Sequence, residues 1–260
     1  MSTALYSKDG QNWADGTPVN WSRDETVSKL VIGTPPRRSG GEPELISPSN
    51  PVPEDLGGIY PNLTHVYLRQ IKHLEVLPHL PDVSCLDVRG CVSLRELQNI
   101  PQTVETLLIE DAASQLAELP NSTRQFMCLK HLSLKGCVGL PEALINGLLQ
   151  RIPNLRILDL SGCSIKKLQP KIKEQSWPDS LVDIRLNSCG RLKRFPPKWP
   201  PALRRLELRQ AKSIEEIPEL PLGADYIDLA GTKSLRRLPQ MPTPSDAHAT
   251  RRPRTCFCPS

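Results

Sequence analysis

The stretch LRILDLSGCSIKKL, residues 155–168, decides the fold of this chain. Its apolar residues occupy positions 1, 4 and 6, counted from Leu155, and a cysteine occupies position 9. Side chains alternate between the two faces of an extended strand, so Leu158 and Leu160 share one face, and the residues between them project to the other face or the margins. One strand cannot bury its apolar face alone, and the stretch therefore predicts further copies stacked beside it.

The chain contains eight copies of this pattern. They begin at residues 63, 83, 104, 129, 155, 181, 203 and 224, at spacings of 20 to 26 residues. Most copies continue with a small residue at position 9 and then enter a proline-rich return such as LPHLP, FPPKWPP or IPELP. Such periodicity predicts a parallel sheet of short strands over one continuous aliphatic core.

The composition agrees with many short elements. Hydrophobic residues make up 38% of the chain but aromatic residues only 4%, so aliphatic side chains must fill the core. The 27 prolines disfavour long helices and central strands. Alternating prolines predict extended, polyproline-like returns. The stretch PEALINGLLQR, residues 141–151, instead predicts a helix on the outer side, with Pro141 at its first position.

The motif resembles the LxxLxLxxNxL repeat of the leucine-rich-repeat family, with Cys, Ala, Thr or Ile in place of the usual Asn. The LPxLP returns are similar to those of effectors that bacteria inject into host cells, whereas LSGCSIKKL and LKGCVGLPE are similar to repeats of plant immune receptors. The resemblance covers residues 63–242 and implies an α/β leucine-rich-repeat solenoid. We expect a curved parallel β-sheet on its concave face, extended and short helical segments on its convex face, and flexible terminal segments.

Four segments follow from the limits of the repeats. Residues 1–32 form an N-terminal segment in which SRDETVSKL predicts one or two helical turns that cover the open edge of the first strand. Residues 33–58 form a Pro/Gly/Ser-rich linker, and residues 59–242 form the repeat domain. Residues 243–260 are expected to be a disordered basic tail.

Cysteine usage and hydropathy point to one compartment. The cysteines at position 9, Cys91, Cys137, Cys163 and Cys189, are expected to be buried reduced thiols rather than disulfides or metal ligands. No apolar run is long enough to span a membrane, and the first residues lack a signal-peptide core. We therefore expect a cytosolic protein, or one secreted without a classical signal peptide into a host cytoplasm.

Charge is distributed unevenly along the chain, whose net charge is +5. Residues 75–119 hold eight acidic residues and two arginines, whereas residues 185–212 hold nine basic residues and one glutamate. Such asymmetry can orient a charged partner, although ordinary solvated surface charge explains it equally well. Nucleic-acid binding is not expected, because the only aromatic residues in the basic region, Phe195 and Trp199, fall in a return.

No residue set predicts catalysis, a cofactor or a metal site. The CLD at residues 85–87 matches the Cys-x-Asp signature of bacterial ubiquitin ligases that carry similar repeats. In those enzymes the cysteine lies in a separate helical domain, whereas Cys85 falls on a predicted strand. The five histidines are scattered, and no phosphate-binding glycine loop is present.

Repeat positions 5 and 7 carry two columns of largely polar side chains on the predicted concave face. Arginine and tyrosine are common anchors of protein interfaces, although solubilising charge explains any single residue equally well. The predicted partner-binding residues are Tyr67, Arg69, Asp87, Arg89, Lys135, Asp159, Arg185, Glu207, Arg209 and Asp228. Reversing the charges of Arg69 and Arg89 together is expected to weaken binding without unfolding the chain.

These observations predict a non-enzymatic protein–protein interaction module, an effector acting on a host protein. The expected partner is another protein, with no small-molecule substrate and no nucleic acid. The alternative is the recognition part, or a truncated form, of a leucine-rich-repeat ubiquitin-ligase effector.

Overall fold

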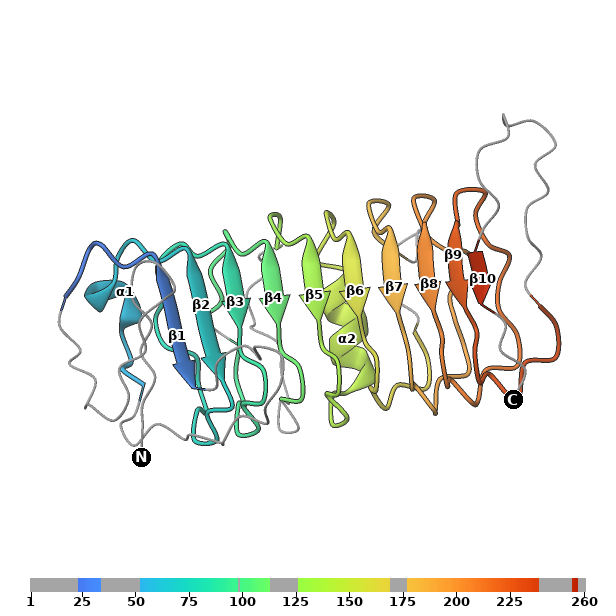
Figure 1. Ribbon diagram of the computed structural model, residues 1–260, viewed down its shortest axis with the longest axis horizontal. Coiled ribbons are helices and arrows are strands. Elements are labelled where there is room, and N and C mark those ends of the chain that lie inside the picture. The colour runs from blue at the N-terminus through green and yellow to red at the C-terminus, as the bar shows by residue number, and fades with distance from the viewer. Residues whose placement is uncertain are drawn as a thin grey trace. The chain divides into compact units, whose positions relative to one another are not determined.

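The computed structural model describes residues 23–33, 52–97, 99–112, 126–168, 177–238 and 254–256. The chain divides into two compact units, residues 1–123 and residues 124–260. In each unit short strands follow one another in parallel and are joined by returns rich in turns (Figure 1).

The first unit is a parallel sheet in which each strand pairs with the next one along the chain. A single short helix precedes the second strand. The elements are β1 (Lys29–Gly33), α1 (Leu56–Ile59), β2 (His65–Arg69), β3 (Cys85–Asp87) and β4 (Thr106–Leu108).

The second unit repeats this architecture, again with parallel pairing between consecutive strands. Its helix follows the first strand and lies behind the sheet in Figure 1. The elements are β5 (His131–Ser133), α2 (Glu142–Leu149), β6 (Ile157–Asp159), β7 (Asp183–Arg185), β8 (Arg205–Glu207), β9 (Tyr226–Asp228) and β10 (Arg254–Cys256).

The strands confirm the repeat register, because β2 to β9 each begin at position 3 of one of the eight repeats. The side chains at positions 1, 4 and 6 are buried in every repeat, with no more than 9% of any of them exposed. Each buried leucine removes apolar surface from water and contributes about 1.5–3 kcal/mol to folding. Both units are therefore leucine-rich-repeat solenoids with an aliphatic core beneath the sheet.

A left-handed residue ends the strand segment of every repeat. Position 8 has a positive φ in all eight copies, at Gln70, Gly90, Asp111, Gly136, Gly162, Ser188, Gln210 and Gly231. In six of these repeats its amide donates to the carbonyl of position 7 in the next repeat, as from Gly162 to Asn187 at 2.7 Å. The hydrogen-bond ladder between repeats thus continues past each three-residue strand into the turn.

The position-9 cysteines point inward, as the sequence predicts. Cys91, Cys137, Cys163 and Cys189 are buried and free. The Sγ of Cys163 donates to the carbonyl of Leu134 at 3.0 Å, and that of Cys189 donates to the carbonyl of Leu160 at 3.1 Å. Each acceptor is at position 6 of the preceding repeat, so the thiols join successive coils without a disulfide. Burial raises the pKa of Cys189 to about 12, which keeps the thiol protonated.

The returns of the second unit hold α2 and a group of aromatic side chains. Helix α2 confirms the helix predicted between residues 141 and 151, and it buries Leu144, Ile145, Leu148 and Leu149. Pro141 is its N-cap rather than its first helical residue. Trp177 and Trp199 stack with ring centroids 5.9 Å apart, and Phe195 contacts Trp199 at 5.0 Å. All three rings are buried and are not available to stack on a nucleic-acid base.

The terminal segments differ from the sequence-based expectation. The helical turns predicted over SRDETVSKL are wrong, because residues 29–33 form β1, which pairs in parallel with β2. Leu30, Val31 and Ile32 form an apolar run without the alternation that marks the repeat strands. By pairing with β2, this segment covers the open edge of that strand. Helix α1 begins at Leu56, inside the expected linker. Within the expected disordered tail, Arg254–Cys256 form β10 against β9. Residues 1–22, 34–51, 239–253 and 257–260 lie outside the described residues.

Candidate functional site

The side chains at repeat positions 3, 5 and 7 project from the sheet on the side opposite the aliphatic core, and we call this surface the polar face. The sequence analysis identified positions 5 and 7 but not position 3. The same two-residue alternation assigns position 3 to this side, since it lies two residues before position 5. Position 3 contributes Cys85 and His65 in the first unit and Asp183, Arg205 and Tyr226 in the second.

In the first unit the polar face centres on Asp87, whose side chain is 0% exposed. Arg69 donates to Asp87 Oδ2 from Nε and Nη2, at 2.8 and 2.6 Å. Arg89 donates from the same two nitrogens, with Nη2 to Oδ2 at 2.7 Å, and hydrogen bonding to Asp87 raises its pKa. Glu110 lies 3.7 Å from Arg89 Nη1. One buried carboxylate is thus shared between two guanidinium groups.

Tyr67 forms the aromatic part of this face. The guanidinium of Arg69 lies 4.9 Å from its ring centroid and Lys29 Nζ lies 5.2 Å from it. His65 stacks on the same ring at 6.5 Å. Burial raises the pKa of Tyr67 to about 12, and interactions with Cys85 act in the same direction. The phenol therefore stays protonated, and its ring contacts two cations. Lys29 comes from β1, which the repeat pattern did not reveal.

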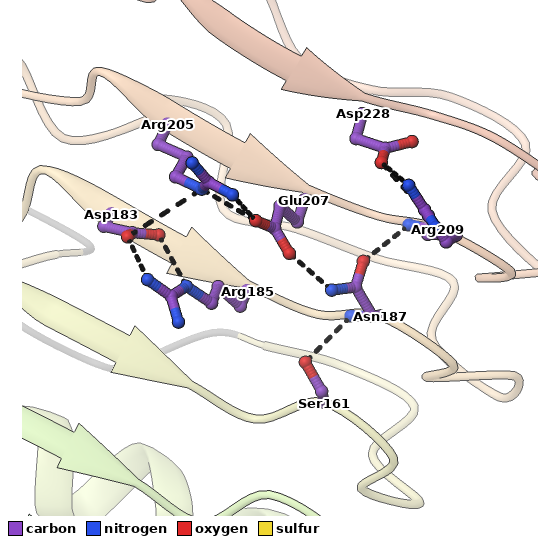
Figure 2. Close-up of polar contacts among 8 residues, drawn as sticks. All are labelled: Ser161, Asp183, Arg185, Asn187, Arg205, Glu207, Arg209 and Asp228. Carbon is purple, nitrogen blue, oxygen red and sulfur yellow. Dashed lines mark hydrogen bonds and ion pairs between the residues drawn. The ribbon is translucent and has the colours of Figure 1, made fainter. Parts of the chain in front are cut away.

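In the second unit the polar face is a chain of ion pairs that runs across three strands (Figure 2). Arg185 on β7 donates from Nη2 to Asp183 Oδ2 at 2.7 Å, and this hydrogen bond raises the pKa of Arg185. Arg205 on β8 lies 4.0 Å from the same carboxylate and also pairs with Glu207. The guanidinium of Arg205 lies 4.2 Å from the ring centroid of Tyr226 on β9.

Asn187 joins these pairs to the next one (Figure 2). Its Nδ2 donates to Glu207 Oε2 at 2.6 Å, and its Oδ1 accepts from the backbone amide of Arg209 at 2.9 Å. Arg209 in turn donates from Nη2 to Asp228 Oδ2 at 2.7 Å. Burial acts to raise the pKa of Glu207, but hydrogen bonds from Asn187 and Arg205 outweigh it and lower that pKa.

Three aspartates at position 5 hold the backbone as well as side chains. Asp87, Asp159 and Asp228 accept hydrogen bonds from the amides two residues later, at 3.2, 2.9 and 3.0 Å. All three are buried. We predicted them as partner-binding residues, and the structure gives them internal partners: they fix the turn after the strand and, in two cases, orient an arginine.

The structure brings most of the predicted residues into two groups. Tyr67, Arg69, Asp87 and Arg89 lie together in the first unit. Arg185, Glu207, Arg209 and Asp228 are linked in the second through the position-3 residues and Asn187. Lys135 and Asp159 belong to neither group. Among the described residues, the exposed side chain of Lys135 makes no ion pair, and Asp159 accepts a hydrogen bond from the amide of Ser161 in its own turn.

The buried state of Asp87 changes one expectation. Reversing Arg69 and Arg89 together removes both cations that neutralise a fully buried carboxylate. An uncompensated buried charge is strongly destabilising. That double variant therefore tests folding and binding at once, and other residues are needed to test binding alone.

The cysteine that matches a ligase signature, Cys85, lies on β3 and not in a helical domain. Burial raises the pKa of Cys85, which leaves its thiol protonated and poorly nucleophilic. No group of three or more His, Cys, Asp or Glu side chains among the described residues can hold a metal ion. Nor is any helix among them long and apolar enough to cross a membrane.

No protein-family model matches the chain. Relatives in Arabidopsis thaliana include Protein SUPPRESSOR OF npr1-1, CONSTITUTIVE 1, which is 30% identical over 56% of this chain and 10% of its own length. Disease resistance protein RPS4B is 26% identical over 65% of this chain and 16% of its own length. Disease resistance protein RPP5 is 29% identical over 52% of this chain and 9% of its own length. The chain thus spans at most about a sixth of these relatives.

The solved structure of YopM from Yersinia enterocolitica WA-314 aligns with 72% of this chain and 55% of its own, at 22% identity and a TM-score of 0.22. The repeat register and the stacked parallel coils show a leucine-rich-repeat fold, and the sequence is similar to parts of plant disease-resistance proteins.

Proposed function

We propose that this chain is a protein-recognition module and that its polar face contacts the partner. The observation that carries the proposal is the set of side chains at positions 3, 5 and 7, which stand on the side of the sheet opposite the aliphatic core and are fixed by bonds to one another. A surface that is ordered before binding loses little conformational entropy, so polar contacts to it retain most of their free energy.

Two kinds of parent protein fit this role. An effector that acts on a host protein stays a prediction from the LPxLP returns. Similarity to disease-resistance proteins supports recognition within an immune protein instead. Either role requires the same contact between the polar face and another protein, so one experiment tests the shared claim.

The surroundings of Cys85 do not favour a ubiquitin-ligase role for it. The thiol lies on β3, its side chain bonds to Tyr67, and its pKa is raised. We therefore propose binding without catalysis by this residue.

Site-specific photo-crosslinking tests the proposal. The full chain would carry p-benzoylphenylalanine at Lys135 or Tyr226 on the polar face, and matched chains would carry it at Lys198 or Glu219 in the returns. In leaf extract we expect a discrete crosslinked protein from the face positions, competed by unlabelled wild-type chain, and little from the returns. Equal crosslinking from the return positions, or no discrete product from any position, would overturn the proposal.

A further inference from the structure

The ion pairs of the polar face are asymmetric in their exposure. In the second unit the side chain of Arg209 is 60% exposed and that of its partner Asp228 is 3% exposed. Arg205 is 41% exposed against 13% for Glu207, and Arg185 is 36% exposed against 13% for Asp183. In each pair the carboxylate lies low against the sheet and the guanidinium lies toward solvent.

The formal charge of the residues on this face therefore differs from the charge that they expose to solvent. Positions 3, 5 and 7 of repeats 4 to 8 carry four cations, which are Lys135, Arg185, Arg205 and Arg209. They also carry four carboxylates, at Asp159, Asp183, Glu207 and Asp228. Three of these carboxylates are buried and the fourth is largely covered, whereas Lys135 and Arg209 are exposed. The set is neutral by count, but its outer layer is cationic.

The three arginines also share one bonding arrangement (Figure 2). Each donates its Nε and Nη2 to an internal carboxylate, as Arg209 does to Asp228 at 3.1 and 2.7 Å. The same two nitrogens of Arg185 bond Asp183, and those of Arg205 bond Glu207. A guanidinium has five N–H groups, so the Nη1 end of each arginine remains for another acceptor.

Such an arrangement suits carboxylates on a partner. The internal pair fixes the plane of each guanidinium before binding. Its outer edge can then donate two parallel hydrogen bonds to a second carboxylate, one from Nη1 and one from the remaining N–H of Nη2. Arg185 lies on β7, Arg205 lies on β8, and Arg209 follows the end of β8 by two residues. Adjacent strands of a sheet lie about 4.8 Å apart. Side chains on one face of an extended segment recur about every 6.6–6.8 Å, so long acidic side chains of one segment can reach guanidinium groups on neighbouring strands.

We infer that the polar face of the second unit binds an acidic segment of a partner protein through Arg185, Arg205 and Arg209. This inference rests on the proposed function and adds the chemistry of the partner. The buried carboxylates act as positioning residues, because they hold the guanidinium groups in place without reaching the partner.

The test uses variants that remove an ion pair without changing the net charge. Arg209→Gln combined with Asp228→Asn deletes one face pair, and Arg185→Gln combined with Asp183→Asn deletes another. Arg236→Gln combined with Glu215→Gln is the matched control, because that 2.8 Å pair is exposed and lies in a return of the same unit. Removing both partners avoids a buried unpaired charge, and circular dichroism would confirm that each variant is folded.

The probes are short fluorescein-labelled peptides read by fluorescence anisotropy. One peptide alternates Glu with Ser, a second alternates Gln with Ser, and an oligothymidine of matched charge is the third probe. We expect the full chain to bind the Glu peptide and not the Gln peptide. Each face variant should bind the Glu peptide about tenfold more weakly, the loss expected from one charged hydrogen-bonded contact, while the control variant binds as wild type does.

Several results would overturn the inference. These are absence of Glu-peptide binding, unchanged binding by both face variants, an equal loss in the control variant, or oligothymidine binding as tight as that of the peptide with the same losses. If the face positions crosslink a protein but the Glu peptide does not bind, the proposed function stands and the inference fails. If the peptide binds through the face and no protein crosslinks, the acidic preference stands and the proposed function fails.

Discussion

In the first unit one fully buried carboxylate, Asp87, serves both Arg69 and Arg89, whereas in the second unit the ion pairs of the arginines are distributed over three carboxylates, Asp183, Glu207 and Asp228. The two faces stand on the same scaffold of parallel strands and left-handed turns. Sharing one buried anion concentrates the stability of the face in a single site. Distributing the pairs over several strands spreads it, so that loss of one member leaves neighbours to compensate. Similar columns of charged side chains in a repeat protein can therefore differ greatly in how each charge affects the free energy of folding.

The largest expected effect comes from removing both cations of the shared site. Arg69→Ala combined with Arg89→Ala leaves Asp87 buried and unpaired, which should lower the free energy of unfolding by about 3–5 kcal/mol. Urea denaturation of the full chain, followed by circular dichroism, measures the change. Adding Asp87→Asn should recover much of the loss, because the uncompensated charge is then gone. If the double variant unfolds at the wild-type urea concentration, Asp87 is not the centre of this face.

The turn at position 8 belongs to the scaffold, so both units should lose stability when its glycine is replaced, the first unit more because a Cβ at Gly90 would lie 2.9 Å from Gln70 Cγ. Gly90→Ala in the first unit and Gly162→Ala in the second force alanine into φ values of +73° and +77°. Each change should lower the free energy of unfolding by about 1–2 kcal/mol. The reverse change Ser188→Gly, at a φ of +59°, should raise it by up to about 1 kcal/mol. Thermal and urea unfolding would measure all three, and a loss confined to one unit would contradict a common scaffold.

A single arginine of the distributed network should matter less than the shared site. In Arg185→Gln, Asp183 keeps Arg205 at 4.0 Å, so we expect a loss of about 1 kcal/mol in the free energy of unfolding. Lys198→Gln, at an exposed position in a return, is the control and should cost little. A loss as large as that of the Arg69 and Arg89 double variant would remove the distinction between the two faces.

The smallest effect is the pH dependence contributed by Glu207. Its pKa is lowered in the folded chain, so the ionised carboxylate stabilises the fold above its ordinary value of 4.5, and that contribution is lost as the pH falls through the lowered pKa. The variant Glu207→Gln should therefore lose less stability than wild type between pH 7 and acid. Urea midpoints measured across that range test the sign, and an identical acid loss in both proteins would contradict it.

The sequence was sufficient for the repeats because their signal is periodic and local. Apolar residues at positions 1, 4 and 6 predicted every strand from β2 to β9, and the cysteines at position 9 predicted buried thiols without disulfides. It failed at β1, where a strand without the repeat motif pairs with β2 only because that edge is open. Non-local pairing of this kind leaves little trace in the residues themselves.

The polar face was predicted only in outline. Alternation assigned Tyr67, Arg185 and Arg209 to one side of the sheet, since side-chain direction in a strand depends on the local backbone alone. Which charges pair, and which are buried, depends on the neighbouring strand, about twenty residues away in sequence. The sequence by itself therefore determined the scaffold and the side on which the charges stand. The folded structure alone shows that Asp183 and Asp228 lie low against the sheet while Arg185 and Arg209 reach solvent, because cross-strand distances and solvent access arise when the coils stack.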